Sequence, residues 1–81
     1  MSVYPNPVQQ TAYINLLASK AGNCIVTLTD INGKQLIKKN YNISVGQNIL
    51  KLDIEKLLKG VYLVKVQQQN IALGSLKVIK N

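Results

Sequence analysis

Few side chains in this sequence could carry out chemistry, and none of them forms a catalytic set. There is no histidine, and the only acidic residues are Asp30, Asp53 and Glu55. A nucleophile needs a base within hydrogen-bond reach, usually histidine. Asp30 and Asp53 could act as a pair only if the fold brought them together, and each stands beside a turn signal, where aspartate usually caps the turn. We therefore expect no catalytic residue and no enzymatic activity.

Metal and cofactor binding are also disfavoured. Cys24 is the only cysteine, and its neighbours Ile25, Val26 and Leu28 favour a small buried hydrophobe over a reactive thiol. Zinc sites of the usual histidine or cysteine kind are excluded, and three acids are too few for a calcium cage. The glycines are isolated turn residues and form no phosphate-binding loop. We expect no metal and no cofactor.

The charge balance is strongly basic, with ten lysines, no arginine and a net charge of +7. Proteins that read nucleic acid usually use arginine forks as well as lysines. We interpret the lysines mainly as a solvated surface. An anionic partner such as lipopolysaccharide, anionic lipid or nucleic acid stays open as the alternative.

The aromatic residues give no clear binding platform. Platforms for sugars or bases need exposed tryptophan or clustered tyrosine, and the chain has no tryptophan. Tyr62 lies in the most apolar run, so we expect it in the core. Tyr4, Tyr13 and Tyr41 could be surface rings, but no pattern indicates that they cluster.

Alternating apolar and polar residues between turn signals predict short β-strands throughout the 81-residue chain. A lead-in over residues 3–8 precedes them, and Pro5 and Pro7 predict that it is extended or turning, with a tight turn plausible at Asn6. The expected strands are residues 11–18, 24–31, 34–42, 49–54, 61–67 and 71–80. Six or seven short strands, with turn signals about 8–12 residues apart, are typical of a β-sandwich or barrel.

Two turn regions and one strand irregularity involve the charged and glycine residues. Asn32-Gly33 predicts a hairpin because both residues tolerate positive φ, and Leu36 is then the best inward candidate of the returning strand. Residues 53–59 have a helix-like composition but predict only a single turn. Gly74 indicates a bulge or a close backbone approach in the last strand.

The last strand is expected to alternate between the core and solvent. Leu76 and Val78 are predicted to point inward, and Lys77 and Lys80 outward. No apolar stretch of about 18 residues occurs, so no membrane span is predicted. The sequence also lacks a secretory signal peptide at its beginning.

Four motifs follow one another along the chain. Tyr4-Pro5-Asn6-Pro7 opens it, and Val26–Lys34 is a hydrophobic strand that ends in D-x-x-G-K, with Asp30, Gly33 and Lys34 at the fixed positions. Leu52–Val66 matches the block LDLSxLxxGxYLVKV, including Leu57, Gly60 and Tyr62, with Ile54 and Glu55 in place of the usual Leu and Ser. The end has the pattern K-hydrophobic-hydrophobic-K, formed by Lys77, Val78, Ile79 and Lys80.

In this order the motifs resemble the C-terminal sorting domain (type A) of proteins exported by the type IX secretion system of Bacteroidetes. The resemblance covers residues 3–81. It implies an all-β fold, an Ig-like antiparallel β-sandwich of about seven short strands. It also implies a non-catalytic secretion signal, covalently fused to an upstream cargo domain and directing it across the outer membrane.

The same resemblance implies partners and a location. The partners are the outer-membrane translocon and, in many members, a sortase-like peptidase that removes the domain. Released or anchored cargo then lies outside the cell or on its surface, having passed the periplasm and outer membrane, and anchoring is to anionic lipopolysaccharide. No nucleic-acid partner is implied.

The resemblance also implies the extent of the domain and the roles of its motif residues. Residues 1–81 form a single sorting domain, with Met1 and Ser2 as added residues and residues 3–8 as the junction to the cargo. Pro5 and Pro7 would stiffen that junction, and Lys77–Lys80 would carry the targeting signal. All motif residues could equally serve only to build the sandwich.

Two other classes of function stay open. A carbohydrate-binding or adhesive β-sandwich module would need an aromatic platform or groove on one face. A lipid- or nucleic-acid-binding module would need the lysines to gather into one stripe.

Overall fold

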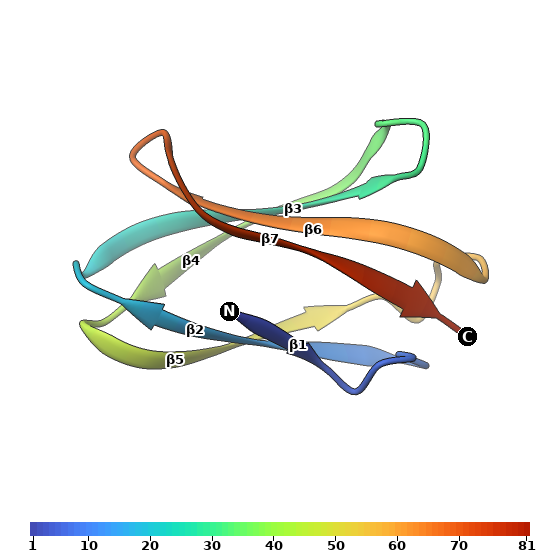
Figure 1. Ribbon diagram of the computed structural model, residues 1–81, viewed down its shortest axis with the longest axis horizontal. Coiled ribbons are helices and arrows are strands. Elements are labelled where there is room, and N and C mark those ends of the chain that lie inside the picture. Colours follow the sequence, from blue (N-terminus) through green and yellow to red (C-terminus); the bar gives the residue numbers. More distant parts are fainter.

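The computed structural model describes residues 1–81 as seven strands in two facing sheets (Figure 1). The strands are β1 (Ser2–Tyr4), β2 (Thr11–Ala18), β3 (Gly22–Asp30), β4 (Gln35–Ile43), β5 (Gly46–Asp53), β6 (Gly60–Gln68) and β7 (Ile71–Lys80). The small sheet has the order β1-β2-β5, and the large sheet has the order β4-β3-β6-β7. Paired strands are antiparallel throughout, so the predicted antiparallel β-sandwich is confirmed. No helix has the length and apolarity needed to cross a membrane.

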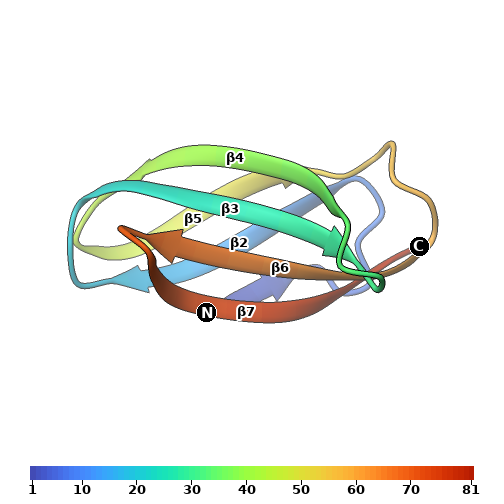
Figure 2. The same ribbon diagram turned by 90° about the horizontal axis from the view of Figure 1, so that it is seen from above.

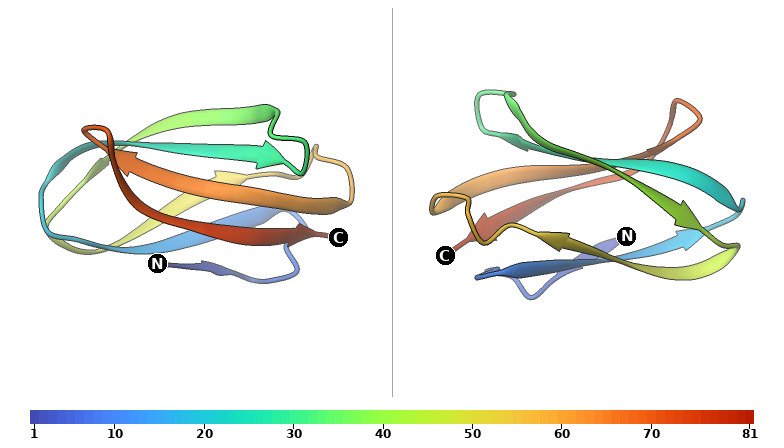
Figure 3. Two further views of the ribbon diagram at one scale, coloured as in Figure 1. Left: turned by 45° about the horizontal axis from the view of Figure 1, so that its top comes forward. Right: turned by 180° about the vertical axis from the view of Figure 1, so that it is seen from behind.

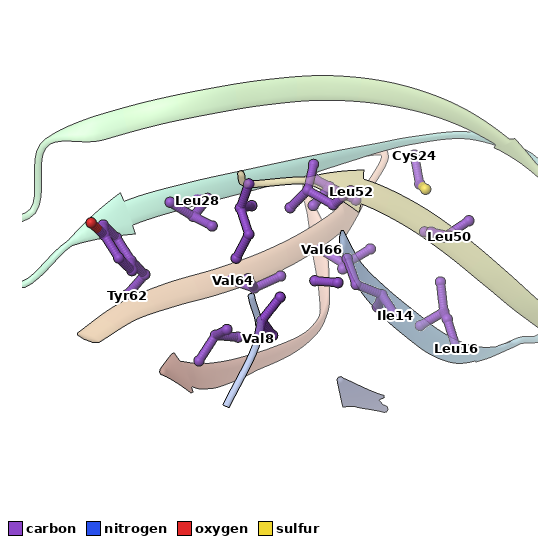
Figure 4. Close-up of a cluster of buried hydrophobic side chains, with 14 of the residues drawn as sticks. Val8, Ile14, Leu16, Cys24, Leu28, Leu50, Leu52, Tyr62, Val64 and Val66 are labelled. Atoms are coloured by element: carbon purple, nitrogen blue, oxygen red, sulfur yellow. The ribbon is translucent and has the colours of Figure 1, made fainter. Parts of the chain in front are cut away.

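Every second side chain of the strands points into the space between the sheets and forms the core. In β2, for example, Ala12, Ile14 and Leu16 are buried, as predicted. Aliphatic residues from both sheets meet in one cluster (Figure 4). Cys24 belongs to this cluster, which confirms its prediction as a small buried hydrophobe. The cluster consists of Val8, Ala12, Ile14, Leu16, Ala18, Cys24, Val26, Leu28, Ile43, Leu50, Leu52, Ile54, Tyr62, Val64, Val66 and Val78.

The connections between strands lie at the two ends of the sandwich (Figures 1 and 3). The β3–β4 and β6–β7 connections are hairpins within the large sheet, whereas β2–β3, β4–β5 and β5–β6 cross between sheets. In the β6–β7 hairpin Gln69 and Asn70 have φ of 52° and 65°, as the central residues of a type I′ turn do. The β3–β4, β5–β6 and β1–β2 connections lie together at one end, and the remaining turns lie at the other (Figure 2).

One prediction about the large sheet is wrong. In the β3–β4 pairing Leu28 lies opposite Ile37, but Thr29 lies opposite Gln35, so Leu36 has no partner across the sheet. Its side chain is 38% exposed, while Ile37 packs against the core. A bulge of this kind shifts the inward–outward alternation by one residue, and alternation counted from the sequence does not register that shift.

The lead-in joins first the small sheet and then the large one. β1 pairs with β2, and after Pro5 and Pro7 the chain reaches Val8, which forms a parallel bridge with Lys80 of β7. The peptide bonds before both prolines are cis. The lead-in, predicted to be extended or turning, is extended in β1 and bends at residues 5–7, and it is a structural part of both layers.

β7 is an edge strand of the large sheet, and Gly74 marks an irregularity in it. Gly74 lies opposite Val66, and the register shifts directly beyond that pair. A Cβ at position 74 would lie only 3.1 Å from the Met1 Cε. The prediction of a bulge or a close backbone approach at Gly74 is confirmed by the bulge; the close neighbour is the Met1 side chain and not a backbone.

Candidate functional site

The β3–β4 hairpin is organised by the side chain of Asp30. Its Oδ1 accepts hydrogen bonds from the backbone N–H of Asn32 and of Lys34, each at 2.9 Å. The Gly33 N–H donates to the Asp30 carbonyl oxygen at 3.1 Å, and only Gly33 in this loop has a positive φ, 85°. This is a three-residue loop, a type I turn followed by a left-handed glycine. The hairpin and the capping role of Asp30 were predicted correctly, and of the two residues that tolerate a positive φ only Gly33 adopts one.

The β5–β6 loop begins with a similar cap. The Asp53 Oδ1 accepts a hydrogen bond from the Glu55 N–H at 3.0 Å. The Leu57 N–H then donates to the Ile54 carbonyl oxygen at 3.1 Å, which closes a single turn as predicted. The Leu57 side chain packs against the core, so this loop is seated on the sandwich by an apolar contact.

Tyr62 fixes the second half of this loop. Its hydroxyl donates a hydrogen bond to the Leu58 carbonyl oxygen at 2.5 Å, while the residue as a whole is only 7% exposed. A tyrosine near the start of a strand that bonds back to the loop before it forms a tyrosine corner, a feature of Ig-like sandwiches. Gly60 lies against the ring, since a Cβ at that position would be 3.9 Å from it. The prediction that Tyr62 is a core residue is confirmed.

The end of β7 is bound to the lead-in by three hydrogen bonds. The Val8 N–H donates to the Ile79 carbonyl oxygen at 2.7 Å, and the Asn81 N–H donates to the Val8 carbonyl oxygen at 2.9 Å. The Ile79 N–H donates to the Asn6 Oδ1 at 3.2 Å. The Asn6 side chain thus adds a third hydrogen bond to the two that the Val8 backbone makes with the end of the chain. The first and last motifs are therefore joined by direct contacts.

Within the closing motif, one orientation differs from the prediction. Lys77 is exposed as expected, but Lys80 is only 8% exposed, so its predicted outward orientation is wrong. Lys80 is two residues from buried Val78, and the alternation of the strand places both on the inner face. Its Nζ donates to the Asn81 carbonyl oxygen at 2.9 Å, which gives the ammonium a partner at the end of the sandwich.

The four motifs therefore converge on one end of the molecule, although they are far apart in sequence (Figure 2). Cross-strand pairing aligns Asp30 with Tyr62 and Tyr62 with Val78, and Gly60 with Lys80. We call this region the motif end and define it as residues 4–8, 30–34, 54–60 and 77–81. A shallow hollow of about 280 Å³ lies between the β3–β4 loop and the β5–β6 loop of this region.

Two exposed apolar side chains at the motif end were not predicted as functional. Ile31 is 79% exposed and Leu58 is 82% exposed, and both line the hollow between the loops. Apolar side chains this exposed bury little of their surface in the free domain, so they are available for apolar contact with a partner. The sequence signal was available, because Ile31 interrupts the polar run Asp30-Asn32-Gly33 and Leu58 follows Leu57 outside the strand alternation.

The structure brings together two tyrosines that the sequence did not connect. The Tyr4 and Tyr13 rings stack with centroids 5.7 Å apart and planes 23° apart. Tyr13, Pro5 and Pro7 also line a second hollow of about 450 Å³. Tyr41 lies elsewhere and donates a hydrogen bond from its hydroxyl to the Lys51 carbonyl oxygen.

The two aspartates described above serve structure. The carboxylates of Asp30 and Asp53 each cap their own turn, and no group of three or more His, Cys, Asp or Glu side chains could hold a metal ion. Burial raises the pKa of the Cys24 thiol above its ordinary value, against the smaller effect of a backbone hydrogen bond at Tyr41. A raised pKa keeps the thiol protonated and unreactive at neutral pH.

Comparison with known proteins assigns a family to this arrangement. The family profile described as a secretion system C-terminal sorting domain matches residues 2–81. Searches of curated proteins and of solved structures each found no match. Since the profile spans nearly the whole chain, including all four motifs, this protein belongs to the family of C-terminal sorting domains of the type IX secretion system.

Proposed function

We propose that this domain directs an attached cargo protein across the outer membrane through the type IX translocon, and that the translocon recognises the motif end. The family consists of sorting signals for secretion, so the attached protein is one that is exported. The proposal is supported by the convergence of motifs up to 73 residues apart in sequence, as in the Asn6–Ile79 hydrogen bond.

The proposed recognition surface combines fixed loops with exposed apolar tips. Asp30 and Tyr62 hold the two loops by side-chain hydrogen bonds, which keeps Ile31 and Leu58 in defined positions. A pre-organised surface loses little conformational entropy on binding. In this proposal Gly33, Lys34, Leu57 and Gly60 shape the loops, and Lys77–Lys80 supply the strand beside them.

The proposal also covers the junction to the cargo and the route of export. Residues 3–8 are the junction to the cargo domain, and a sortase-like peptidase acts there or upstream of it. The route passes the periplasm and the outer membrane and ends at the cell surface or in the medium. The domain itself performs no reaction, and its part is binding.

A fusion experiment tests the proposal. Residues 1–81 are placed behind a signal peptide and a fluorescent reporter in a host that has the type IX machinery, and reporter is measured in periplasm, surface and medium. We expect export of the wild-type fusion. Retention of that fusion in the periplasm would overturn the proposal.

A pair of double variants tests the surface. Ile31→Gln with Leu58→Gln changes two exposed residues of the motif end, and Leu17→Gln with Ile71→Gln changes two exposed apolar residues outside it. We expect periplasmic retention only for the first pair, with both variants as stable as the wild type. Equal export of the two would contradict recognition at the motif end.

A carbohydrate-binding function has one supporting observation, the Tyr4–Tyr13 pair beside its hollow. Because the rings stack on one another, each has only its other face left for a sugar. The motif end contains more of the family's motif residues than the Tyr4–Tyr13 pair does, so we favour the sorting function over carbohydrate binding.

A further inference from the structure

The outer face of the large sheet concentrates positive charge in a way that the sequence order hides. Thr27 in β3 lies between Lys38 of β4 and Lys65 of β6 in one row across the sheet. In the next row Leu63 of β6 lies beside Lys77 of β7. Strands lie about 4.8 Å apart, so Lys38 and Lys65 stand roughly 10 Å apart on either side of Thr27, and Lys77 lies one strand and one row beyond Lys65. Figure 2 views the large sheet from this side.

This face has no negative charge to balance the lysines. Of the three acidic residues, Asp30 caps the β3–β4 hairpin and Asp53 caps the turn that contains Glu55. Asp53 belongs to β5, in the other sheet. Positive charge without nearby carboxylates produces a potential that attracts anionic partners.

Aliphatic side chains adjoin the lysines on the same face. Val61 lies opposite Ile79, and both are partly exposed, as is Leu63. Lysines next to exposed aliphatic residues are typical of protein surfaces that lie in a membrane interface, with the ammonium groups at the phosphates and the aliphatic groups at the acyl boundary.

The chemistry of the face favours a lipid surface over nucleic acid. Nucleic acid binding uses arginine and stacking aromatic rings, but the chain has no arginine. Its tyrosines are also absent from this face, because Tyr4 and Tyr13 belong to the small sheet, Tyr62 is buried, and Tyr41 packs against the core. A broad sheet face also matches a planar surface better than it matches a groove-bound ligand.

We propose that the outer face of the large sheet, through Lys38, Lys65 and Lys77, docks the domain on a membrane surface that carries phosphate groups. The contact shares Lys77 with the motif end, but Lys38 and Lys65 lie outside it, and the contact does not depend on the sorting function. It holds the domain against the lipid, with the opposite sheet facing away from the lipid.

Vesicle binding of matched triple variants tests this proposal. One variant carries Lys38→Gln, Lys65→Gln and Lys77→Gln, and the control carries Lys20→Gln, Lys51→Gln and Lys56→Gln, so each loses three of the ten lysine charges. Binding is measured by co-flotation with vesicles of phosphatidylglycerol and phosphatidylcholine, and with phosphatidylcholine vesicles alone. Circular dichroism and thermal melting establish that both variants are folded.

A lysine close to an anionic membrane contributes roughly fivefold in affinity, so three contribute on the order of 100-fold. We expect the first variant to lose affinity for the anionic vesicles on the order of 100-fold, and the control variant to lose at most about fivefold. We expect no binding of the wild type to phosphatidylcholine vesicles alone. Added salt should weaken wild-type binding by screening. Equal losses in both variants would overturn the proposal, and so would absence of wild-type binding to the anionic vesicles. Binding to polyglutamate without binding to vesicles would overturn it in favour of an acidic protein partner.

Discussion

Replacing Tyr62 by phenylalanine isolates the contribution of one hydrogen bond at the motif end. The change keeps the buried ring and removes only the hydroxyl that donates to the Leu58 carbonyl oxygen. No cavity of side-chain size forms, so the cost is that of a lost hydrogen bond and a partly buried carbonyl without its partner, about 1–2 kcal/mol. For a domain of this size that cost corresponds to a fall in Tm of about 5–15 °C.

The assay is thermal and urea unfolding of the Tyr62→Phe variant beside the wild type, followed by circular dichroism. Hydrogen exchange should also accelerate in residues 55–60, because the Tyr62 hydroxyl holds that loop to β6. Tyr4→Phe is the matched control, since Tyr4 is exposed and stacks on Tyr13 through its ring. Its stability should change by less than about 0.5 kcal/mol. A fall in Tm below about 2 °C for Tyr62→Phe, or an equal fall for Tyr4→Phe, would refute the reasoning.

Three further changes test other parts of the structure. Asn6→Ala removes the acceptor of the Ile79 N–H, so amide exchange at Ile79 should accelerate and stability should fall by about 0.5–1.5 kcal/mol; unchanged exchange would contradict the contact. Gly33→Ala should cost about 1–2 kcal/mol in urea unfolding, because φ is 85° and the left-handed region is unfavourable for residues with a Cβ, while Gly33→Asn should cost less. The raised pKa of Cys24 means that the unfolded chain loses the thiol proton first, so stability is fully present below the ordinary pKa of 9.0 and declines as pH rises through the folded-state pKa. Urea unfolding between about pH 8 and 10 should show a shallower decline for Cys24→Ala, and an unchanged slope would count against burial of the thiol.

Much of the fold could be predicted because apolar alternation specifies strands locally. The run from Thr11 to Ala18 is a strand with the expected buried face, and the final strand has its predicted bounds. Turn chemistry also acts locally, so the Asp30 cap follows from neighbouring residues alone. These features depend on contacts within a few residues, and the sequence displays such contacts directly.

What could not be predicted depends on contacts between distant segments. The bulge that turns Leu36 outward is a property of the β3–β4 register, and alternation within one strand does not reveal it. The hydrogen bond between Asn6 and Ile79 joins opposite ends of the chain, so no local pattern indicates it. Resemblance to a family supplied the motif residues, but their convergence and the exposure of Ile31 and Leu58 required the fold.

The lead-in also determines how the domain responds to mechanical load. Its residues are hydrogen-bonded to β2 of the small sheet and to Ile79 and Asn81 of the large sheet. A pull on the N-terminus therefore acts along paired strands in both layers, and several hydrogen bonds resist it together before any long strand is extracted. Under the proposed function an attached cargo would pull on this same segment, which also secures the last residues of β7, so that pull would be transmitted directly to the other end of the domain.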